Sequence, residues 1–354
     1  MKRTALAITL LVPLLSLITV QFTDLATADP FAIPMQYLPT IYIKNDGTIN
    51  PATTLIQRVG DVYTFTGNIV NYTIIVQRDN IIIDGSGYTL QTNYPDTRLG
   101  WGWGDDDAIT ISDRSNVTIQ NIKIKGFSQG INVANSSHNN ITGNYIVECN
   151  YPIWFTSSSY NNITKNNITG NIGEAIILSR SHNNSVTNNS IAKNRGGISL
   201  SFSSNNKIVG NDVTYNTNGV GLSDASNNFF YLNNFVNNTN QVYIWAKEEV
   251  SNIWDNGEVG NFWSNYNGTD ANGDGVGDTP FIVETPETVN IFRRLETFGA
   301  NQQDSFPLME WYVGQKLPLP TNVQHSIEVY VIVFAVLSTI ISTGLFVYFK
   351  KRNH

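Results

Sequence analysis

Three consecutive carboxylates follow two tryptophans in one stretch of this sequence. Asp105, Asp106 and Asp107 come shortly after Trp101 and Trp103. Neighbouring carboxylates can act as general acid and base on a glycosidic bond, and indole rings stack on the apolar faces of sugars. The stretch therefore has the residue types for sugar binding, and Asp106 or Asp107 would be the acid or base if a bond were cleaved. A solvated acidic loop is the alternative interpretation.

A second acidic segment has the spacing of a calcium loop. Asp270, Asn272 and Asp274 offer oxygen ligands on alternate residues around glycines, and Asp278 would stand at the ninth position. The twelfth position is Phe281 and not the bidentate glutamate of an EF-hand. We therefore predict a calcium site of modest affinity, with an acidic glycine-rich turn that holds no metal as the alternative.

The composition excludes several classes of protein. Charged residues make up 14% of the 354 residues, against about 25% in an average soluble domain. Asparagine occurs 46 times, and 30 of these lie between Asn116 and Asn240, which argues against a helical bundle because asparagine is a poor helix former. A net charge of −7 argues against a basic nucleic-acid binder. With Cys149 as the single cysteine, no intramolecular disulfide framework can form.

Both ends of the chain carry targeting patterns. Two basic residues precede an apolar run from Ala5 to Val20, and Ala26-Thr27-Ala28 fits a cleavage site, so residues 1–28 are predicted to be a secretory signal peptide. An uncleaved N-terminal anchor is the alternative. Near the other end, residues 329–349 contain no charge and are followed by three basic residues. As a helix these 21 residues span roughly 31 Å, enough to cross the hydrocarbon layer, so we predict a transmembrane helix over 327–349 with a cytoplasmic tail at 350–354.

The body of the chain is thus expected outside the cell, in a single-pass protein of the cell membrane. Ten Asn-x-Ser/Thr sequons are compatible with a glycoprotein. They do not decide the question, because a chain rich in asparagine, serine and threonine forms sequons by chance.

A repeat of 22 residues, with one interval of 23, predicts the architecture. Apolar pairs recur at Ile109/Ile111, Ile131/Val133, Ile153/Phe155, Ile176/Leu178, Ile198/Leu200, Val220/Leu222 and Val242/Ile244. Two more apolar columns keep the same period. Two asparagine columns accompany them. We predict that the first contains Asn116, Asn139, Asn161, Asn184, Asn206 and Asn228, and that the second contains Asn121, Asn144, Asn166, Asn189, Asn211 and Asn233. Three short alternating stretches per repeat, separated by turn formers, are typical of strands.

We therefore predict an all-β fold, a right-handed parallel β-helix with about 22 residues per coil. In such a stack each asparagine column would form a ladder of side-chain amides. The predicted domains are an N-terminal cap at 29–72, coils at 73–246 with an insertion loop at 91–107, a C-terminal cap at 247–312 and a linker at 313–326.

Several motifs carry a family resemblance. They are Ile81-Ile-Ile-Asp-Gly-Ser-Gly-Tyr-Thr-Leu, the asparagine-rich coils, and the segment from Asn261-Phe-Trp-Ser-Asn-Tyr to Asp278-Thr-Pro-Phe. On these motifs the chain resembles the NosD-type family of secreted parallel β-helix repeat proteins, particularly membrane-anchored archaeal surface members. The resemblance implies a pectin-lyase-like fold and a broad superfamily of carbohydrate-binding proteins and sugar hydrolases. Founding members of the family assist copper-site assembly in nitrous oxide reductase.

Copper is poorly matched by the residues present. Copper favours Cys, Met and His ligands, and the chain has four His, three Met and one Cys. Only His138 and His182 lie on the coils, two coils apart and so about 10 Å from each other at the spacing of stacked strands. We expect them to be turn residues.

Catalysis also lacks a suitable carboxylate pair. Glycosidases place two carboxyl groups roughly 5–9.5 Å apart, whereas Asp107 and Glu174 share a row three coils apart, about 14 Å. The Asp105–Asp107 cluster resembles the Gly-Asp-Asp motif of polygalacturonases, but the companion motifs Asn-Thr-Asp and Gly-His-Gly are absent.

Binding without cleavage needs fewer groups. Trp154, at an outward position of its strand, and Asn132 would join Trp101, Trp103 and Asp105 in a carbohydrate site. These tryptophans could instead cover an open end of the fold. We expect a surface protein that binds a carbohydrate or cell-envelope polymer and no nucleic acid, with a polysaccharide lyase or glycoside hydrolase as the alternative function.

Overall fold

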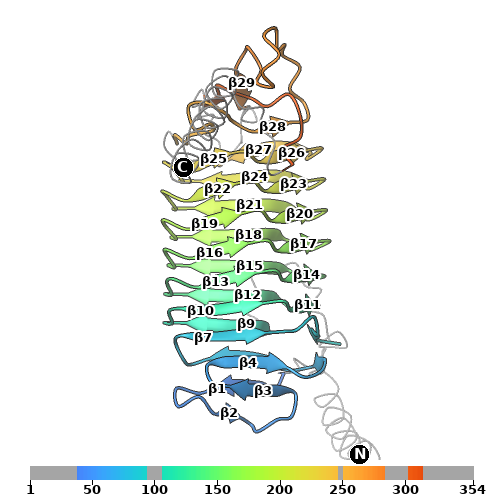
Figure 1. Cartoon of the computed structure of the whole chain (residues 1–354), viewed down its shortest axis with the longest axis vertical. Coiled ribbons are helices and arrows are strands. Elements are labelled where there is room, and N and C mark those ends of the chain that lie inside the picture. The colour runs from blue at the N-terminus through green and yellow to red at the C-terminus, as the bar shows by residue number, and fades with distance from the viewer. Residues whose placement is uncertain (1–37, 94–105, 246–249, 284–301, 314–354) are drawn as a thin grey trace, which may run out of the picture. The chain divides into compact units, whose positions relative to one another are not determined.

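The computed structural model describes residues 38–93, 106–245, 250–283 and 302–313. All regular elements in these ranges are β-strands, and successive coils stack on one another (Figure 1). Trp101, Trp103 and Asp105 lie outside the described residues, as do the predicted signal peptide at 1–28 and the predicted transmembrane helix at 327–349. In the part of the chain that is described, no helix is long and apolar enough to cross a membrane.

Each coil contributes one strand to each of three sheets. Sheet A runs in the order β2 (Ile49–Asn50), β1 (Thr40–Ile43), β6 (Thr73–Val76), β9 (Asp107–Ser112), β12 (Gln129–Ala134), β15 (Tyr151–Thr156), β18 (Glu174–Ser179), β21 (Gly196–Ser201), β24 (Asn218–Ser223) and β27 (Asn240–Ile244). Sheet B runs in the order β3 (Ile56–Val59), β4 (Val62–Phe65), β7 (Ile81–Asp84), β10 (Val117–Gln120), β13 (Asn140–Thr142), β16 (Asn162–Thr164), β19 (Ser185–Thr187), β22 (Lys207–Val209) and β25 (Phe229–Tyr231). Sheet C runs in the order β5 (Ile69–Val70), β8 (Thr89–Gln91), β11 (Lys123–Lys125), β14 (Tyr145–Val147), β17 (Asn167–Thr169), β20 (Ser190–Ala192), β23 (Asp212–Thr214), β26 (Asn234–Val236) and β28 (Phe262–Trp263). A separate antiparallel pair joins β29 (Phe281–Val283) and β30 (Gln302–Asp304).

The register follows the repeat of the sequence. Ile131 pairs in parallel with Ile153, 22 residues later, and Ile153 pairs with Ile176 across the single interval of 23. The predicted parallel β-helix is confirmed.

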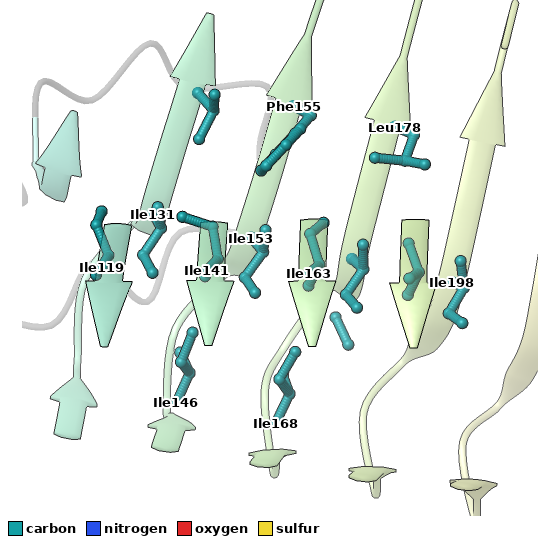
Figure 2. Close-up of a cluster of buried hydrophobic side chains, with 14 of the residues drawn as sticks. Ile119, Ile131, Ile141, Ile146, Ile153, Phe155, Ile163, Ile168, Leu178 and Ile198 are labelled. Atoms are coloured by element: carbon teal, nitrogen blue, oxygen red, sulfur yellow. The ribbon is translucent and has the colours of Figure 1, made fainter. Parts of the chain in front are cut away.

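The core is a stack of aliphatic side chains from all three sheets. Ile131, Ile141 and Ile146 come from sheets A, B and C of one coil, and all three are fully buried. Their counterparts on neighbouring coils lie beside them (Figure 2). Each buried isoleucine contributes roughly 1.5–3 kcal/mol to folding, so the repeated apolar columns are the main source of stability.

Buried asparagines form ladders along the stack. Asn161 shows the pattern: its Oδ1 accepts from the backbone N and the Nδ2 of Asn139 at 2.8 and 3.1 Å, and its own N and Nδ2 donate to Asn184 Oδ1 at 2.9 and 3.1 Å. A carboxamide suits this position because its oxygen accepts two hydrogen bonds from one coil while its nitrogen donates to the next. Ladder asparagines donate along the stack in both directions: Asn161 N and Nδ2 donate to Asn184 on the C-terminal side, and Asn161 Nδ2 also donates to Ser136 O on the N-terminal side at 3.1 Å.

The described coils contain three such columns. The members are Asn139, Asn161, Asn184, Asn206, Asn228 and Asn252 in the first, Asn144, Asn166, Asn189, Asn211, Asn233 and Asn261 in the second, and Asn171, Asn194, Asn216 and Asn238 in the third. The third column was not predicted.

Two predicted column members are wrong by one residue. Val117 and Ile122 precede Asn139 and Asn144 in the columns, since their backbone N–H groups donate to those amides. Asn116 and Asn121 lie at exposed corners with φ of 56° and 54°. Asparagine tolerates this left-handed backbone better than most residues do, so a corner asparagine and a ladder asparagine look alike in the sequence.

The stack begins earlier than predicted. β1, β4 and β5 pair in parallel with β6, β7 and β8, so residues 40–70 already form a coil within the region predicted to be an N-terminal cap at 29–72. The antiparallel strands β2 and β3 interrupt this coil. They break the 22-residue period that placed the boundary at residue 73.

Aromatic rings close the C-terminal end of the core. Trp254 stacks on Phe230 with ring centroids 4.4 Å apart, and Trp263 stacks on Phe235 at 4.6 Å. Both indoles are almost fully buried. These residues continue the apolar columns with larger side chains beyond the last coil.

The same segment ends two of the ladders. Asn252 N donates to Gln302 Oε1 at 3.1 Å, and Asn261 N donates to Asp304 Oδ2 at 2.7 Å. Both acceptors lie on β30. The last amides of the first two columns thus have acceptors although no further coil follows.

Candidate functional site

The outward side of sheet A carries a polar and aromatic cluster on four successive coils. Its members are Asp107, Gln129, Asn132, Tyr151, Trp154 and Glu174, which we call the sheet A cluster. All six are partly exposed, whereas the second, third and fifth residues of each of these strands are buried in the core. Two consecutive buried residues interrupt the alternation of side chains once in each strand, so residues three apart, such as Gln129 and Asn132, both lie on the outward face.

Two rows build the cluster. In the first row Gln129 pairs with Asp107 on one side and with Tyr151 on the other. Glu174 continues this row, because Tyr151 and Glu174 each lie two residues before the paired Ile153 and Ile176. In the second row Asn132 pairs with Trp154. The sequence predicts Asn132, Trp154 and Asp107 as site residues, and the structure brings them together.

Gln129 and Tyr151 were not predicted as site residues. The sequence contains a signal for them, because they lie 22 and 44 residues after Asp107 and so belong to the same row of the repeat.

Asp107 is held by its neighbours. Its Oδ2 accepts hydrogen bonds from Asn132 Nδ2 at 2.7 Å and from Thr110 Oγ1 at 3.3 Å. Asp106 lies directly before β9 and is also partly exposed. The two weak catalytic candidates thus stand at the start of this strand.

Tyr151 and Trp154 form an edge-to-face pair. Their ring centroids lie 5.0 Å apart with an interplanar angle of 70°. Gly173, in the following coil, makes room for the phenol, because a Cβ there would lie 2.8 Å from a Tyr151 ring carbon and 2.4 Å from Asn150 O. Burial, followed by the negative charge of Glu174, raises the pKa of Tyr151.

Three buried polar atoms at this face have no hydrogen-bond partner within the described residues. They are Gln129 Oε1, Trp154 Nε1 and, at the corner before β15, Asn150 Oδ1. Unpaired buried polar atoms are rare in folded proteins, and each costs about 1–3 kcal/mol. Two acceptors and a donor in one region are therefore available to a ligand.

The carboxylates of the cluster are too far apart for a glycosidase pair. Asp107 and Glu174 are separated by three coils, or about 14 Å at the spacing of stacked strands, against a requirement of roughly 5–9.5 Å. Asp105, the third member of the acidic run, lies outside the described residues.

The predicted calcium loop folds around Asp270. Its two carboxylate oxygens accept from the backbone N–H groups of Gly273 at 2.7 Å and Gly275 at 2.9 Å. Asp278 Oδ2 accepts from Ala271 N at 2.8 Å, and Asn272 Nδ2 donates to Asp274 Oδ2 at 2.9 Å. Across the described residues, no three His, Cys, Asp or Glu side chains form a group that could hold a metal ion. Calcium binding stays a prediction.

Copper ligands are not brought together either. The Sγ of Cys149 is buried, and burial raises the pKa of this thiol to about 12, so it is not a thiolate. The ring of His138 stacks on Tyr160, while His182 Nδ1 accepts from Ser204 N at 3.1 Å. These residues do not fit a copper site, because none of them supplies a ligand to a shared centre.

Comparisons with known proteins identify the family of this chain. A family model described as periplasmic copper-binding protein (NosD) matches residues 65–268, which is more than half of the chain. The comparison with curated proteins gave no match.

Among solved structures, the periplasmic alginate epimerase AlgG is similar with 16% identity and a TM-score of 0.35, covering 58% of this chain and 72% of that one. A hyperthermoactive exopolygalacturonase from Thermotoga maritima is similar with 15% identity and a TM-score of 0.34, covering 60% and 63%. A tailspike protein of an Escherichia coli O157:H7 bacteriophage is similar with 13% identity and a TM-score of 0.30, covering 62% and 34%.

Proposed function

This chain belongs to the NosD family, and we propose that it binds a carbohydrate polymer at the sheet A cluster without cleaving it. The observation that carries the proposal is the set of unpaired buried atoms, Gln129 Oε1, Trp154 Nε1 and Asn150 Oδ1, beside two aromatic rings. Buried polar groups of this kind are expected to find partners in the bound state.

Sugar hydroxyls are suitable partners. A hydroxyl both donates and accepts, so neighbouring hydroxyls of one polymer could donate to Gln129 Oε1 and accept from Trp154 Nε1. The rings of Tyr151 and Trp154 would cover the apolar face of a sugar residue. A parallel β-helix repeats its rows at about 4.8 Å, which gives an extended polymer successive contacts along the stack.

The spacing of the carboxylates favours binding over cleavage. Asp107 Oδ2 already accepts from Asn132 and Thr110, and Glu174 is about 14 Å away along the stack. A polysaccharide lyase or hydrolase that uses Asp106 or Asp107 is the alternative. Release of reducing ends or of unsaturated sugars from a glycan panel would establish it.

We place the protein at the cell surface, with the predicted signal peptide at 1–28 removed and the predicted helix at 327–349 in the membrane. This placement would direct the coils toward cell-envelope polymers. Copper-site assembly is not proposed, because the Cys and His residues of the coils do not fit the metal.

A glycan array tests the proposal with matched variants. Trp154→Ala is expected to weaken binding of the best glycan by tenfold or more, since it would remove both the ring contact and the hydrogen bond from Nε1, and about 1.4 kcal/mol corresponds to a tenfold change. Tyr243→Ala is the control, because Tyr243 ends the same row four coils on, as the pairs from Trp154 through Ile177, Ser199 and Gly221 show.

The control should bind within twofold of wild type. Equal binding by wild type and Trp154→Ala would contradict the assignment of the site, and an array without any signal for wild type would contradict the function. Joint replacement of Trp101 and Trp103 by alanine tests the predicted contribution of the loop.

A further inference from the structure

The ten sequons are distributed unevenly over the three sheets. Three lie on strands, Asn140 and Asn162 in sheet B and Asn167 in sheet C. Six lie at corners with positive φ, and Asn267 lies in the C-terminal cap. The corner residues are Asn71, Asn116, Asn135, Asn183, Asn188 and Asn237. None of the ten lies on a strand of sheet A.

The sequon asparagines are also separate from the ladder asparagines. All ten are at least partly exposed, while the ladder members are buried. In the first two columns the residue two positions after each ladder asparagine is a buried apolar residue, as Ile163 is after Asn161, so the hydroxyl of a sequon cannot stand there. In the third column that residue is a glycine or an asparagine. On the coils, the sequon asparagines lie on the outside, and so do their hydroxyl residues except Thr73 of the Asn71 sequon, which is buried.

One row of hydroxyl residues on the outward side of sheet A is interrupted next to the sheet A cluster. The last outward residue of each strand from β9 to β24 carries a hydroxyl except in β12. The row reads Ser112, Ala134, Thr156, Ser179, Ser201 and Ser223.

The residue two positions before the interruption is Asn132 of the sheet A cluster. It is the only asparagine at this place in the six strands. The corresponding residues are Thr110, Asn132, Trp154, Ile177, Ser199 and Gly221. A serine or threonine at position 134 would complete the sequon Asn132-Val-Ser/Thr. The hydroxyl residue of this row is thus missing in the one coil where it would complete a glycosylation sequon on the candidate binding face.

We propose that N-linked glycans cover sheets B and C and the corners of this protein, and that Ala134 keeps the outer face of sheet A free of them. The inference rests on the proposed function in two respects, export of the chain and binding of a ligand at the sheet A cluster. A glycan on Asn132 would displace that ligand, because Asn132 pairs directly with Trp154.

The modification is a transfer from a lipid-linked oligosaccharide in the secretory pathway. The carboxamide nitrogen of the acceptor asparagine forms a bond to the anomeric carbon of the first sugar. The bond from that carbon to the lipid phosphate breaks, the phosphate leaves with the electron pair, and the nitrogen loses one proton. No oxidant or reductant is needed.

The stack also limits how many sites can be filled. Asn140 and Asn162 are paired residues of neighbouring strands, so their side chains are about 4.8 Å apart. A sugar ring is wider than this spacing. We therefore expect single molecules to carry a glycan on one of the two and not on both.

The experiment compares the full chain with two variants in a host that N-glycosylates secreted proteins. Mass spectrometry of glycopeptides should find glycans on sheets B and C and at corners in wild type. Ala134→Thr should gain one glycan, on Asn132, and lose glycan-array binding by tenfold or more. Ala134→Val is the control, because valine has the shape of threonine without the hydroxyl, and it should gain no glycan and bind as wild type does.

Three outcomes would overturn the inference: wild type without glycans on sheets B and C, Ala134→Thr without a glycan on Asn132, or a glycosylated Ala134→Thr that still binds its ligand. Ala134→Thr made in a host without N-glycosylation separates this inference from the proposed function. It should bind as wild type does, and a failure of wild type itself to bind would count against the proposed function alone.

Discussion

The buried asparagine columns and the outward rows of sheet A differ sharply in how much they vary. From Asn139 to Asn252 the first column keeps one residue type over six coils, with the same pair of hydrogen bonds at each step. On sheet A the row that contains Asp107 changes at each of its first four coils, to Gln129, Tyr151 and Glu174. Both sets stack at the same spacing.

This difference in variability reflects two different requirements, one on buried positions and one on outward positions. A buried position that meets its own counterpart above and below is best served by one self-complementary residue. An outward position has no such requirement, so variation there is free to serve a ligand. Unpaired atoms occur at the variable face and not in the columns, as this division predicts.

The largest effect is expected inside a column. Asn161→Ala should lower the free energy of unfolding by about 3 kcal/mol or more, because it removes the acceptor of the buried Asn139 backbone N–H and the side-chain donor to Asn184 Oδ1 and Ser136 O. Asn162→Ala is the matched control, an exposed asparagine one residue later, and should change stability by about 0.5 kcal/mol or less. Chemical unfolding of protein from a non-glycosylating host measures both, and similar losses would contradict the comparison.

A second test concerns the end of a column. Burial raises the pKa of Asp304 from 3.8 to about 6, although hydrogen bonds from Trp263 and Asn261 oppose the rise. The folded state then binds this proton more tightly than the unfolded state, so the stabilising contribution is complete below about pH 4 and is lost as pH rises to about 6. The expected loss is roughly 3 kcal/mol.

Asp304→Asn removes the titration and supplies the reference. Unfolding free energies measured between pH 4 and pH 7 should fall more steeply for wild type than for this variant. Parallel curves would show that Asp304 does not titrate in this range.

A smaller effect, of opposite sign, is expected on the variable face. Gln129→Met keeps the length of the side chain and removes the unpaired Oε1, so it should raise stability by about 1 kcal/mol while weakening glycan binding. Gln120→Met is the control, since Gln120 Nε2 donates to Asp84 Oδ2 at 2.8 Å, and it should not be stabilising. A Gln129→Met variant that is less stable than wild type would argue against the proposal that Gln129 Oε1 is unpaired until a ligand binds.

The smallest effect concerns the loop around Asp270. With a dissociation constant near 1 mM, which is typical of extracellular calcium modules, 1 mM calcium would stabilise the protein by about 0.4 kcal/mol. Calorimetric titration of wild type and of Asp270→Asn detects binding more directly than melting does. Equal heats for the two proteins would remove the calcium site.

The repeat made the fold predictable, because each core position recurs with its stacking partner at a constant interval. Val133, Phe155 and Leu178 could be assigned to one column from spacing alone. The first coil escaped prediction since its antiparallel strands β2 and β3 break the interval.

The site was predictable only in part. Row membership follows from the interval, and that placed Asn132 beside Trp154. Which polar atoms lack a partner depends on side-chain conformation and on depth of burial, and neither can be obtained from the spacing of Gln129 or Asn150. Asn116 shows the same limit, because corner and column differ there by a single residue.

The way the columns finish has a consequence for assembly. Each coil exposes hydrogen-bond donors of its ladder asparagines on its C-terminal side. A second molecule that offered hydrogen-bond acceptors at its end could therefore extend the stack. Gln302 and Asp304 fill those positions from within the molecule. These two residues thus occupy the donors at the end of the stack. Without them, molecules could associate end to end into fibres.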